Sequence, residues 1–217
     1  MKKTIAVFDV DRTIIKGTSC ERLFVDYLRN KGVIGFSQKF SFAKRFIFTI
    51  FRNKIMATKG NKYYLKGLEK QKTDEMAKEF FNVEIIPRIS EDAVKKIEEH
   101  RKEGMEIVLL SGTLEVLMKL LQKHLNVERV HCSDMEIVEG KYTGDIIGKF
   151  PFGSAKADII RMNYSSDKYD LSASYAYGDH PTDLGFLQVF GHGFIVNPDA
   201  KLEQKAKKKG VGVVRFE

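Results

Sequence analysis

Short apolar runs and helical patterns alternate along most of the chain. The apolar runs are bounded by polar residues or glycine and lie at residues 4–8, 106–110, 174–177, 193–196 and 212–214. Runs of this kind predict buried strands of a parallel sheet. Longer segments with apolar residues at helical spacing lie between most of them. Strands that alternate with helices predict an α/β fold, a Rossmann-like parallel sheet with helices on both faces.

Several element boundaries follow from capping and turn residues. Ser90 precedes two acids and opens a helix that should end at Lys102, because Gly104 follows. A second helix should open near residue 113 and run to about residue 125. Residues 135–144 hold two short strand patterns around a Glu-Gly pair, which predicts a small β-hairpin.

The stretch from residue 18 to residue 89 breaks the alternation, because its apolar spacing is helical throughout. On a helical wheel, part of it forms one broad apolar arc, made of Phe40, Ala43, Phe46, Ile47, Phe48, Ile50, Phe51 and Ile55. Ser41, Arg45, Thr49 and Arg52 face the other way. Apolar stripes are usually core faces, so we favour a small helical bundle that buries this arc. The predicted division is an α/β core of residues 1–16 and 90–217 and a helical cap of residues 17–89.

Positive charge is concentrated in the predicted cap. The chain has a formal net charge of +8, and the stretch from Lys31 to Lys72 holds eleven Lys and Arg residues against one acid, Glu69. Eight aromatic residues lie in the same stretch. Besides the bundle core, a second hypothesis stays open, in which this face handles an amphiphilic phosphate at an anionic membrane surface. Nucleic acid is not expected, because the aromatics repeat at core spacing and no nucleic-acid motif frames them.

Composition excludes several classes of protein. Of the 217 residues, 43% are hydrophobic and 30% are charged, which rules out disordered, collagen-like and disulfide-scaffold chains. The two cysteines lack zinc-site spacing, and a reducing compartment fits them best. No apolar run approaches the roughly 18 residues of a membrane span, and the run after the amino terminus is too short for a signal peptide. We therefore expect a soluble, cytoplasmic protein.

Reactive residue types follow the predicted strands in a definite order. Asp9, Asp11 and Thr13 follow the first strand, Ser111 and Gly112 follow the second, Lys156 begins a later helix, and Asp179 and Asp183 follow the strand at 174–177. The carboxyl ends of parallel strands share one edge, so we expect these side chains to meet there. Each group alone is explained as a turn or helix cap. Four groups in this order make coincidence the harder explanation.

This set of motifs resembles the haloacid dehalogenase (HAD) superfamily of phosphohydrolases. The helical insert after the first motif is similar to the cap of its phosphoserine-phosphatase-like branch, subfamily IB. The resemblance implies a Mg²⁺-dependent phosphatase acting on a small or amphiphilic phosphate monoester. Asp9 would be the nucleophile that forms an aspartyl-phosphate, and Asp11 the general acid and then base. Phosphotransfer by the same residues and a non-catalytic binding protein are the alternatives.

The same resemblance assigns the remaining motif residues. Mg²⁺ would be held by the carboxylates of Asp9 and Asp179 and by the backbone carbonyl of Asp11. Phosphoryl oxygens would be bound by Ser111, the backbone at Gly112, and Lys156. Asp183 would orient Lys156 and the metal shell, and Thr13 would fix the nucleophile loop or contact phosphate.

Four further residues are candidates for contact with the substrate. Phosphoserine phosphatases carry glutamate nine positions after the nucleophile, where this chain has Thr18, and asparagine where it has Thr182. These departures disfavour phosphoserine as the substrate. Arg12 either contacts substrate phosphate or points to solvent, and Arg45 is a candidate on the cap.

Overall fold

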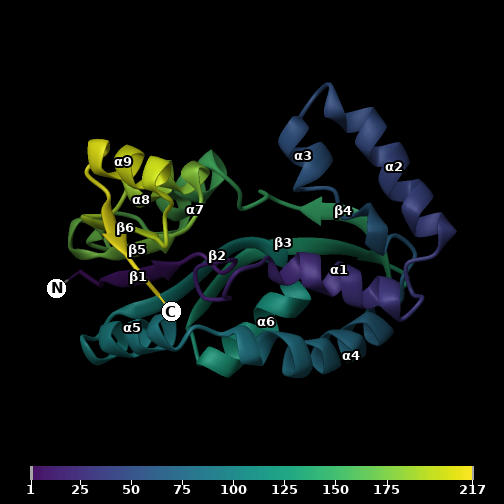
Figure 1. Ribbon diagram of the computed structural model, residues 1–217, viewed down its shortest axis with the longest axis horizontal. Helices are drawn as coiled ribbons and strands as arrows, with labels where there is room; N and C mark the ends of the chain where they lie inside the picture. Colours follow the sequence, from purple (N-terminus) through teal and green to yellow (C-terminus); the bar gives the residue numbers. More distant parts are fainter. Residues whose placement is uncertain (1, 217) are drawn as a thin grey trace.

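The computed structural model describes residues 2–216 and has a seven-stranded sheet at its centre (Figure 1). The strand order is β4-β3-β2-β1-β5-β6-β7, and every pair is parallel except β3 with β4. The strands are β1 (Ile5–Phe8), β2 (Glu106–Leu114), β3 (Arg129–Val138), β4 (Lys141–Ile147), β5 (Tyr175–Gly178), β6 (His192–Val196) and β7 (Gly212–Val214). The predicted α/β fold is confirmed. The strand order reverses at β1, the position where such sheets bind ligands.

The α-helices lie between these strands, in the order expected from the sequence. They are α1 (Cys20–Asn30), α2 (Phe36–Ile50), α3 (Lys54–Thr58), α4 (Lys70–Phe80), α5 (Glu91–Lys102), α6 (Glu115–Leu125), α7 (Ser154–Asn163), α8 (Leu184–Leu187) and α9 (Ala200–Lys208). The predicted bounds of α5 and α6 are confirmed. Ser90 caps α5, since its Oγ accepts a hydrogen bond from the backbone N–H of Ala93 at 3.3 Å.

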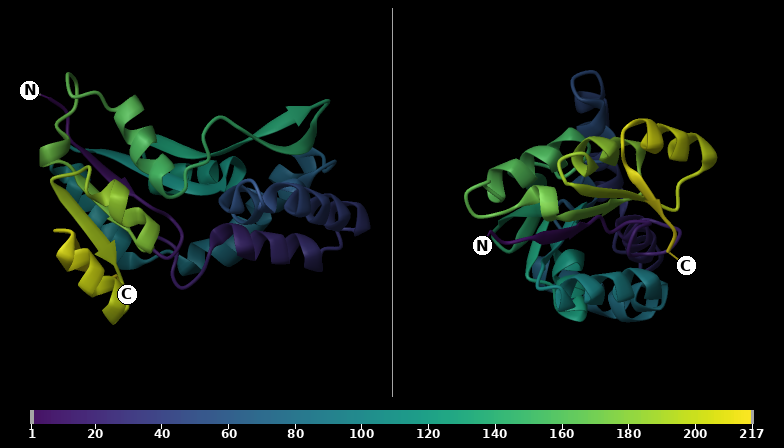
Figure 2. Two further views of the ribbon diagram at one scale, coloured as in Figure 1. Left: turned by 90° about the horizontal axis from the view of Figure 1, so that it is seen from above. Right: turned by 90° about the vertical axis from the view of Figure 1, so that its left-hand side faces the viewer.

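Helices cover both faces of the sheet, and alternate strand residues pack against them (Figure 2). Ile5 and Val7 of β1 lie in an apolar cluster with α7, α8 and α9. Ala6 and Phe8 lie in a second cluster with α5 and α6. All four side chains are fully buried, so β1 is enclosed on both sides. This burial fixes the position of the strand that directly precedes Asp9.

Strand β3 contains a segment that the apolar pattern did not reveal. The predicted hairpin is confirmed, with a turn whose Glu139 and Gly140 have φ of 49° and 74°. However, β3 already begins at Arg129, and its first half pairs with β2 in parallel. That half is rich in polar residues and only partly buried, so it has no apolar run to mark it. One long strand therefore serves both the parallel sheet and the hairpin.

Every regular element between β1 and β2 is helical, as expected. Helices α1 and α4 bury Phe24 and Phe80 in the same cluster as the α5 and α6 side of the sheet. Helices α2 and α3 project beyond the sheet, at the upper right of Figure 1. The hairpin reaches this insert, where the backbone N–H of Gly67 donates to the carbonyl of Tyr142 at 2.8 Å. No helix within residues 2–216 is long and apolar enough to cross a membrane.

The expectation that the apolar arc of α2 lies in a bundle core is wrong. None of the residues of α2 is buried, and Phe40 and Ile47 have exposed fractions of 61% and 66%. The helix turns its polar side to the protein instead. Arg45 bonds Asp145, with Nη2 and Oδ1 separated by 3.3 Å. Phe42 on the same side packs against the core cluster and the Tyr64 ring, so contacts with distant segments, which a hydrophobicity pattern does not predict, set the orientation of this helix.

Candidate active site

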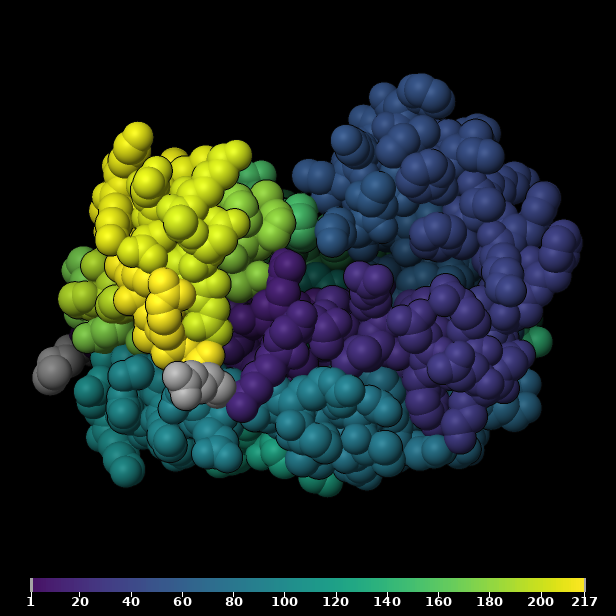
Figure 3. Space-filling model, in the orientation of Figure 1, coloured from purple at the N-terminus to yellow at the C-terminus, as the bar shows by residue number. Residues whose placement is uncertain are grey.

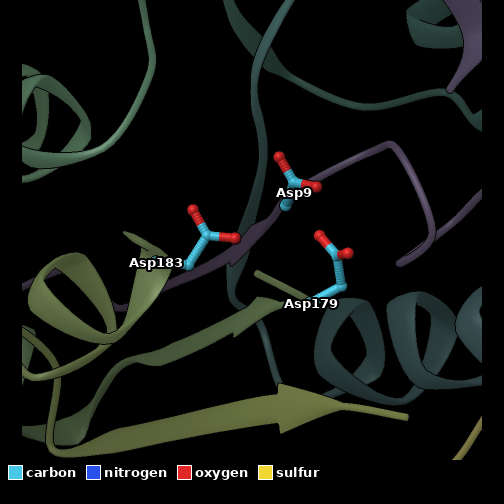
Figure 4. Close-up of side chains that lie close together, drawn as sticks. All are labelled: Asp9, Asp179 and Asp183. Carbon is cyan, nitrogen blue, oxygen red and sulfur yellow. The ribbon is translucent and has the colours of Figure 1, made fainter. Parts of the chain in front are cut away.

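Three carboxylates converge at the carboxyl edge of the sheet (Figure 4). Asp9 follows β1, Asp179 follows β5, and Asp183 ends the short helical turn Pro181–Asp183. Each offers a ligand oxygen, and these oxygens lie within 4.8 Å of one another. The turn folds back closely over Gly178, where an added Cβ would lie 2.9 Å from Oδ2 of Asp183. Glycine at position 178 therefore lets Asp183 approach the other two carboxylates.

Lys156 links two of these acids. Its Nζ lies 2.6 Å from Oδ1 of Asp9 and 2.8 Å from Oδ1 of Asp183, and its side chain is 5% exposed. Burial alone would lower the pKa of Lys156, but the two carboxylates outweigh it and raise the pKa. Burial raises the pKa of Asp9 well above its usual range, Lys156 lowers it, and the neighbouring acids raise it further. The lysine is therefore charged and neutralises part of a crowded acidic site.

Arg12 forms an ion pair with the acidic cluster at the mouth of the site. Its backbone adopts the left-handed conformation, with φ of 58°. Its Nε lies 2.8 Å from Oδ2 of Asp179, although its side chain is half exposed. Burial raises the pKa of Asp179 to about 6, while Arg12 acts in the opposite direction. Arg12 thus bonds one oxygen of a predicted metal ligand.

The carboxylate of Asp11 accepts a hydrogen bond from the helical insert. Its Oδ1 accepts a hydrogen bond of 2.8 Å from the backbone N–H of Cys20, at the start of α1. Burial raises the pKa of Asp11, partly offset by hydrogen bonds from Ser19 and Cys20. A carboxyl group with a raised pKa retains its proton at higher pH than usual, as a general acid requires.

Two of the predicted phosphate-binding residues, Ser111 and Gly112, lie near the end of β2. The backbone N–H of Thr113 donates to Oγ of Ser111 at 3.3 Å. Gly112 passes so close to Phe150 that an added Cβ would lie 2.8 Å from its ring. Thr13 is 2% exposed, does not line the cavity described next, and its Oγ1 has no hydrogen-bond partner among residues 2–216. Its backbone N–H donates to the carbonyl of Val10 at 3.3 Å, so Thr13 belongs to the turn that follows Asp9.

These groups open into one cavity of about 730 Å³ between the sheet and the helical insert. Figure 3 shows a hollow between the projecting lobe of α2 and α3 and the part of the chain that follows β4. Thr18 and Thr182 line this cavity, together with Asp9, Asp11 and Lys156. Arg45 does not line it, because its guanidinium is held by Asp145. The structure thus brings together all the predicted site residues except Thr13 and Arg45.

Residues 6–188 match the family of haloacid dehalogenase-like hydrolases. The chain belongs to this family. It is 28% identical over 223 residues to a histidinol-phosphatase of Neisseria meningitidis, which covers 99% of each chain. Its fold is similar to a protein of unknown function from Bordetella pertussis, with a TM-score of 0.82, 22% identity and 99% of each chain covered. It is also similar to a phosphoserine phosphatase solved as a phospho-aspartyl intermediate analogue, with a TM-score of 0.66, 20% identity, and coverage of 98% and 94%. Another similar protein is named a phosphoserine phosphatase, from Mycobacterium tuberculosis; it is 24% identical over 216 residues, which cover 94% of this chain and 68% of that protein.

HAD phosphatases typically require Mg²⁺, and the residues of this chain fit such an ion. The cluster of Asp9, Asp179 and Asp183 offers only carboxylate oxygens, which are the ligands that Mg²⁺ prefers. Lys156 and Arg12 supply two positive charges against three carboxylates and the nearby Asp11. The uncompensated negative charge is a further reason for a divalent cation to bind here.

A buried ion pair in the cavity wall was not predicted from the sequence. Lys62 is 2% exposed, and its Nζ bonds Oε2 of Glu21 and lies 3.4 Å from the carbonyl of Gly112. Tyr64 donates its hydroxyl to the other oxygen of Glu21 at 2.5 Å. In the sequence, Lys62 is one of eleven basic residues in its stretch, so nothing sets it apart. The one signal in the sequence was that Glu21 lies three positions after Thr18, a candidate for contact with the substrate.

Proposed function

We propose that this HAD phosphatase hydrolyses a phosphate monoester through an aspartyl-phosphate formed on Asp9. The observation that carries the proposal is the bridge from Lys156 to both Asp9 and Asp183, at the bottom of a cavity that also contains Asp11 and Ser111. The bridge holds one oxygen of Asp9 and leaves the other available to attack phosphorus. Such a paired, buried carboxylate beside an acid with a raised pKa is the arrangement that covalent phosphoryl transfer needs.

The reaction proceeds in two steps on this chain. Asp9 attacks phosphorus, the bond to the alcohol oxygen breaks, and Asp11 gives its proton to the leaving alcohol. Asp11 then takes a proton from water, which attacks the phosphorus of the aspartyl-phosphate and releases inorganic phosphate. Ser111, the backbone at Gly112, and Lys156 bind the phosphoryl oxygens through both steps.

We assign the metal site to Asp9 and Asp179, with the backbone carbonyl of Asp11 as expected from the resemblance and Asp183 as a further carboxylate beside them. When bound, Mg²⁺ supplies positive charge that lets a carboxylate approach an anionic phosphate. Residues 17–89 form the proposed cap, and they close one side of the cavity with Thr18, Glu21 and Lys62.

The leaving alcohol of the substrate faces a mixed surface. Phe42, Phe150 and Phe152 line the cavity together with the Glu21 and Lys62 pair. Aromatic rings next to a charged pair suit an alcohol that has both an apolar and a charged part. The proposed substrate is therefore a small or amphiphilic monoester. Histidinol phosphate and phosphoserine enter as candidates because similar proteins are named for them.

Phosphate release from a panel of monoesters tests this proposal. The panel contains para-nitrophenyl phosphate, phosphoserine, histidinol phosphate, glycerol phosphate and lysophosphatidic acid, each with Mg²⁺ and with EDTA. We expect release that EDTA reduces by at least about 100-fold, because the cation offsets charge repulsion at the nucleophile. Metal-independent release, or no release from any member, would contradict the proposal.

Substitution of the buried ion pair of Glu21 and Lys62 tests whether this pair binds the leaving alcohol of the substrate. In the double variant Glu21→Gln/Lys62→Met, both charges disappear together, so neither is left buried and unpaired. We expect KM to rise about tenfold for charged alcohols, because the loss of a hydrogen bond to a charged group costs about 1.5 kcal/mol. The kcat for para-nitrophenyl phosphate should stay within about threefold of wild type. Steady-state kinetics across the panel measure both values.

The matched control is Lys31→Met/Glu79→Gln, which removes an ion pair of the cap that lies outside the cavity and is about half exposed. We expect the control to keep wild-type KM values, since exposed pairs contribute little. If Glu21→Gln/Lys62→Met raised KM equally for every substrate, the pair would serve the phosphate-binding loop and not the alcohol.

A further inference from the structure

The outward side of α2 is an apolar stripe that faces solvent. Phe36, Phe40, Ala43, Ile47 and Phe51 recur three or four residues apart, so they project from one side of the helix and its end. The four large side chains have exposed fractions of 85%, 61%, 66% and 94% in that order. We refer to these five residues as the α2 stripe. A contiguous exposed apolar surface of this kind marks an interaction site.

The orientation of the stripe is fixed by contacts on the other side of α2. Gln38 donates to the carbonyl of Lys66 at 3.2 Å. Arg45 bonds Asp145, and its guanidinium carbon lies 5.0 Å from the centre of the Tyr63 ring. A helix on the surface of a globular protein normally buries its apolar side. Here Gln38, Arg45 and the partly buried Phe42 contact the protein, whereas the stripe is presented outward.

The surface around the stripe is basic. Residues 32–68 contain no Asp or Glu, so no acid of this stretch offsets its lysines and arginines. Lys39 and Lys44 are exposed on α2, and Arg52 and Lys54 follow directly after it. The surface thus combines large aromatic side chains with a one-sided positive charge.

We propose that α2 docks on an anionic lipid bilayer, lying in its surface with the stripe inserted. Interfacial helices bury their apolar side about 5–10 Å deep and keep basic residues at the headgroups. The stripe and the flanking Lys39, Lys44 and Arg52 provide both parts of this pattern. The proposal goes beyond the phosphatase function and does not depend on it.

Charge argues for a bilayer over a second copy of this chain. A dimer formed through α2 about a twofold axis would place the basic surface of one copy against the same surface of the other. With no acid in residues 32–68, nothing in this stretch compensates that repulsion. An anionic bilayer attracts the same residues.

The lobe that carries the stripe also forms part of the cavity wall. Phe42 of α2, Thr58 of α3 and the adjacent Lys59 line the cavity. The lobe of α2 and α3 that carries the stripe stands beside the hollow in Figure 3. In a docked enzyme, the helix that contacts the lipid therefore also forms part of the cavity wall.

Sedimentation with vesicles tests the docking surface in the whole chain. The vesicles are phosphatidylcholine alone, or phosphatidylcholine with one third phosphatidylglycerol. We expect wild type to sediment with the anionic vesicles, and less so at high salt. The variant Phe40→Ser/Ile47→Ser/Phe51→Ser should lose at least about tenfold in partitioning, because it removes most of the inserted area. Lys44→Glu/Arg52→Glu should lose binding by about tenfold or more.

Two matched controls carry the same changes elsewhere. Val83→Ser/Met162→Ser removes exposed apolar side chains outside α2, and Lys119→Glu/Lys123→Glu reverses two exposed charges on α6. Both should bind vesicles like wild type. Turnover of para-nitrophenyl phosphate should be unchanged in the stripe variant. This measurement distinguishes a variant that has only lost membrane binding from one that has lost its fold or its activity.

Three results would overturn docking. The first is wild type that does not sediment with anionic vesicles, and the second is stripe variants that bind as wild type does. The third is a dimer in light scattering that dissociates in the stripe variant, together with no vesicle binding, which would make this surface an interface between copies.

Discussion

Asp9→Asn should abolish turnover while the protein stays folded. The amide occupies nearly the same volume as the carboxylate but is a poor nucleophile, and loss of a nucleophile costs at least about 10³-fold in kcat. Lys156 keeps its second partner, Asp183, and one of three crowded negative charges disappears. We therefore expect a thermal unfolding midpoint equal to or above that of wild type. Phosphate release and thermal unfolding measure the two effects.

The comparison variant is Asp11→Asn, which keeps the nucleophile and removes the acid and base. With para-nitrophenyl phosphate the leaving group needs little protonation, so the first step continues while the second slows. Asp11→Asn should therefore accumulate phosphoenzyme, visible by mass spectrometry after an acid quench, whereas Asp9→Asn should not. Asp167→Asn, at an exposed loop position, is the control for the substitution itself. Near-normal turnover by Asp9→Asn would exclude the covalent route.

The carboxyl-edge residues were predictable because sheet topology alone brings them together. Asp9, Ser111 and Asp179 each follow an apolar run, and parallel strands place such residues at one edge whatever the packing around them. Lys156 was predictable only through the resemblance, since a lysine at the start of a helix is usually solvated. Lys156 is buried, with 5% of its side chain exposed, because it pairs with two carboxylates that are distant in the sequence.

The parts that were not predictable depend on polar contacts between distant segments. The orientation of α2 depends on the pair of Arg45 and Asp145, which are 100 residues apart, and on the packing of Phe42 against Tyr64. The Glu21 and Lys62 pair joins the start of α1 to a short turn after α3, and neither residue stands out in the sequence. The first half of β3 lies at the border of the parallel sheet and so lacks an apolar run. Hydrophobic patterns report burial within one segment, whereas these features depend on contacts between segments that are distant in the sequence.

Lys156→Met should lower both activity and stability, because it leaves Asp9 and Asp183 buried without their shared cation. Removing one partner of a buried ion pair costs about 3–5 kcal/mol in unfolding free energy. For a chain of this length that corresponds to a midpoint lower by about 10 °C. Loss of charge stabilisation at the phosphoryl oxygens should reduce kcat by about 10²–10³-fold. Thermal unfolding in EDTA and steady-state kinetics measure these effects.

The stability lost in Lys156→Met should increase with pH. The folded-state pKa of Asp9 is raised, first by burial, so its contribution to stability is present below the unfolded pKa of about 3.9. That contribution is lost as pH rises through the folded pKa. The pKa of Lys156 is also raised, so the stability it contributes is fully present below its unfolded pKa of about 10.4. Without Lys156 the pKa of Asp9 rises further, and the variant should be closer to wild type at pH 5 than at pH 8.

A second substitution separates this electrostatic effect from a loss of packing. Lys156→Met/Asp183→Asn removes one of the two unpaired acids, so it should recover part of the lost stability at pH 8 but none of the activity. Lys149→Met, whose partner Asp158 lies 3.6 Å away on the surface, is the matched control and should change neither stability nor turnover. If the double variant were no more stable than Lys156→Met at pH 8, unpaired charge would not be the cause. The bridge from Lys156 to Asp9 and Asp183 would then stabilise the fold mainly through packing.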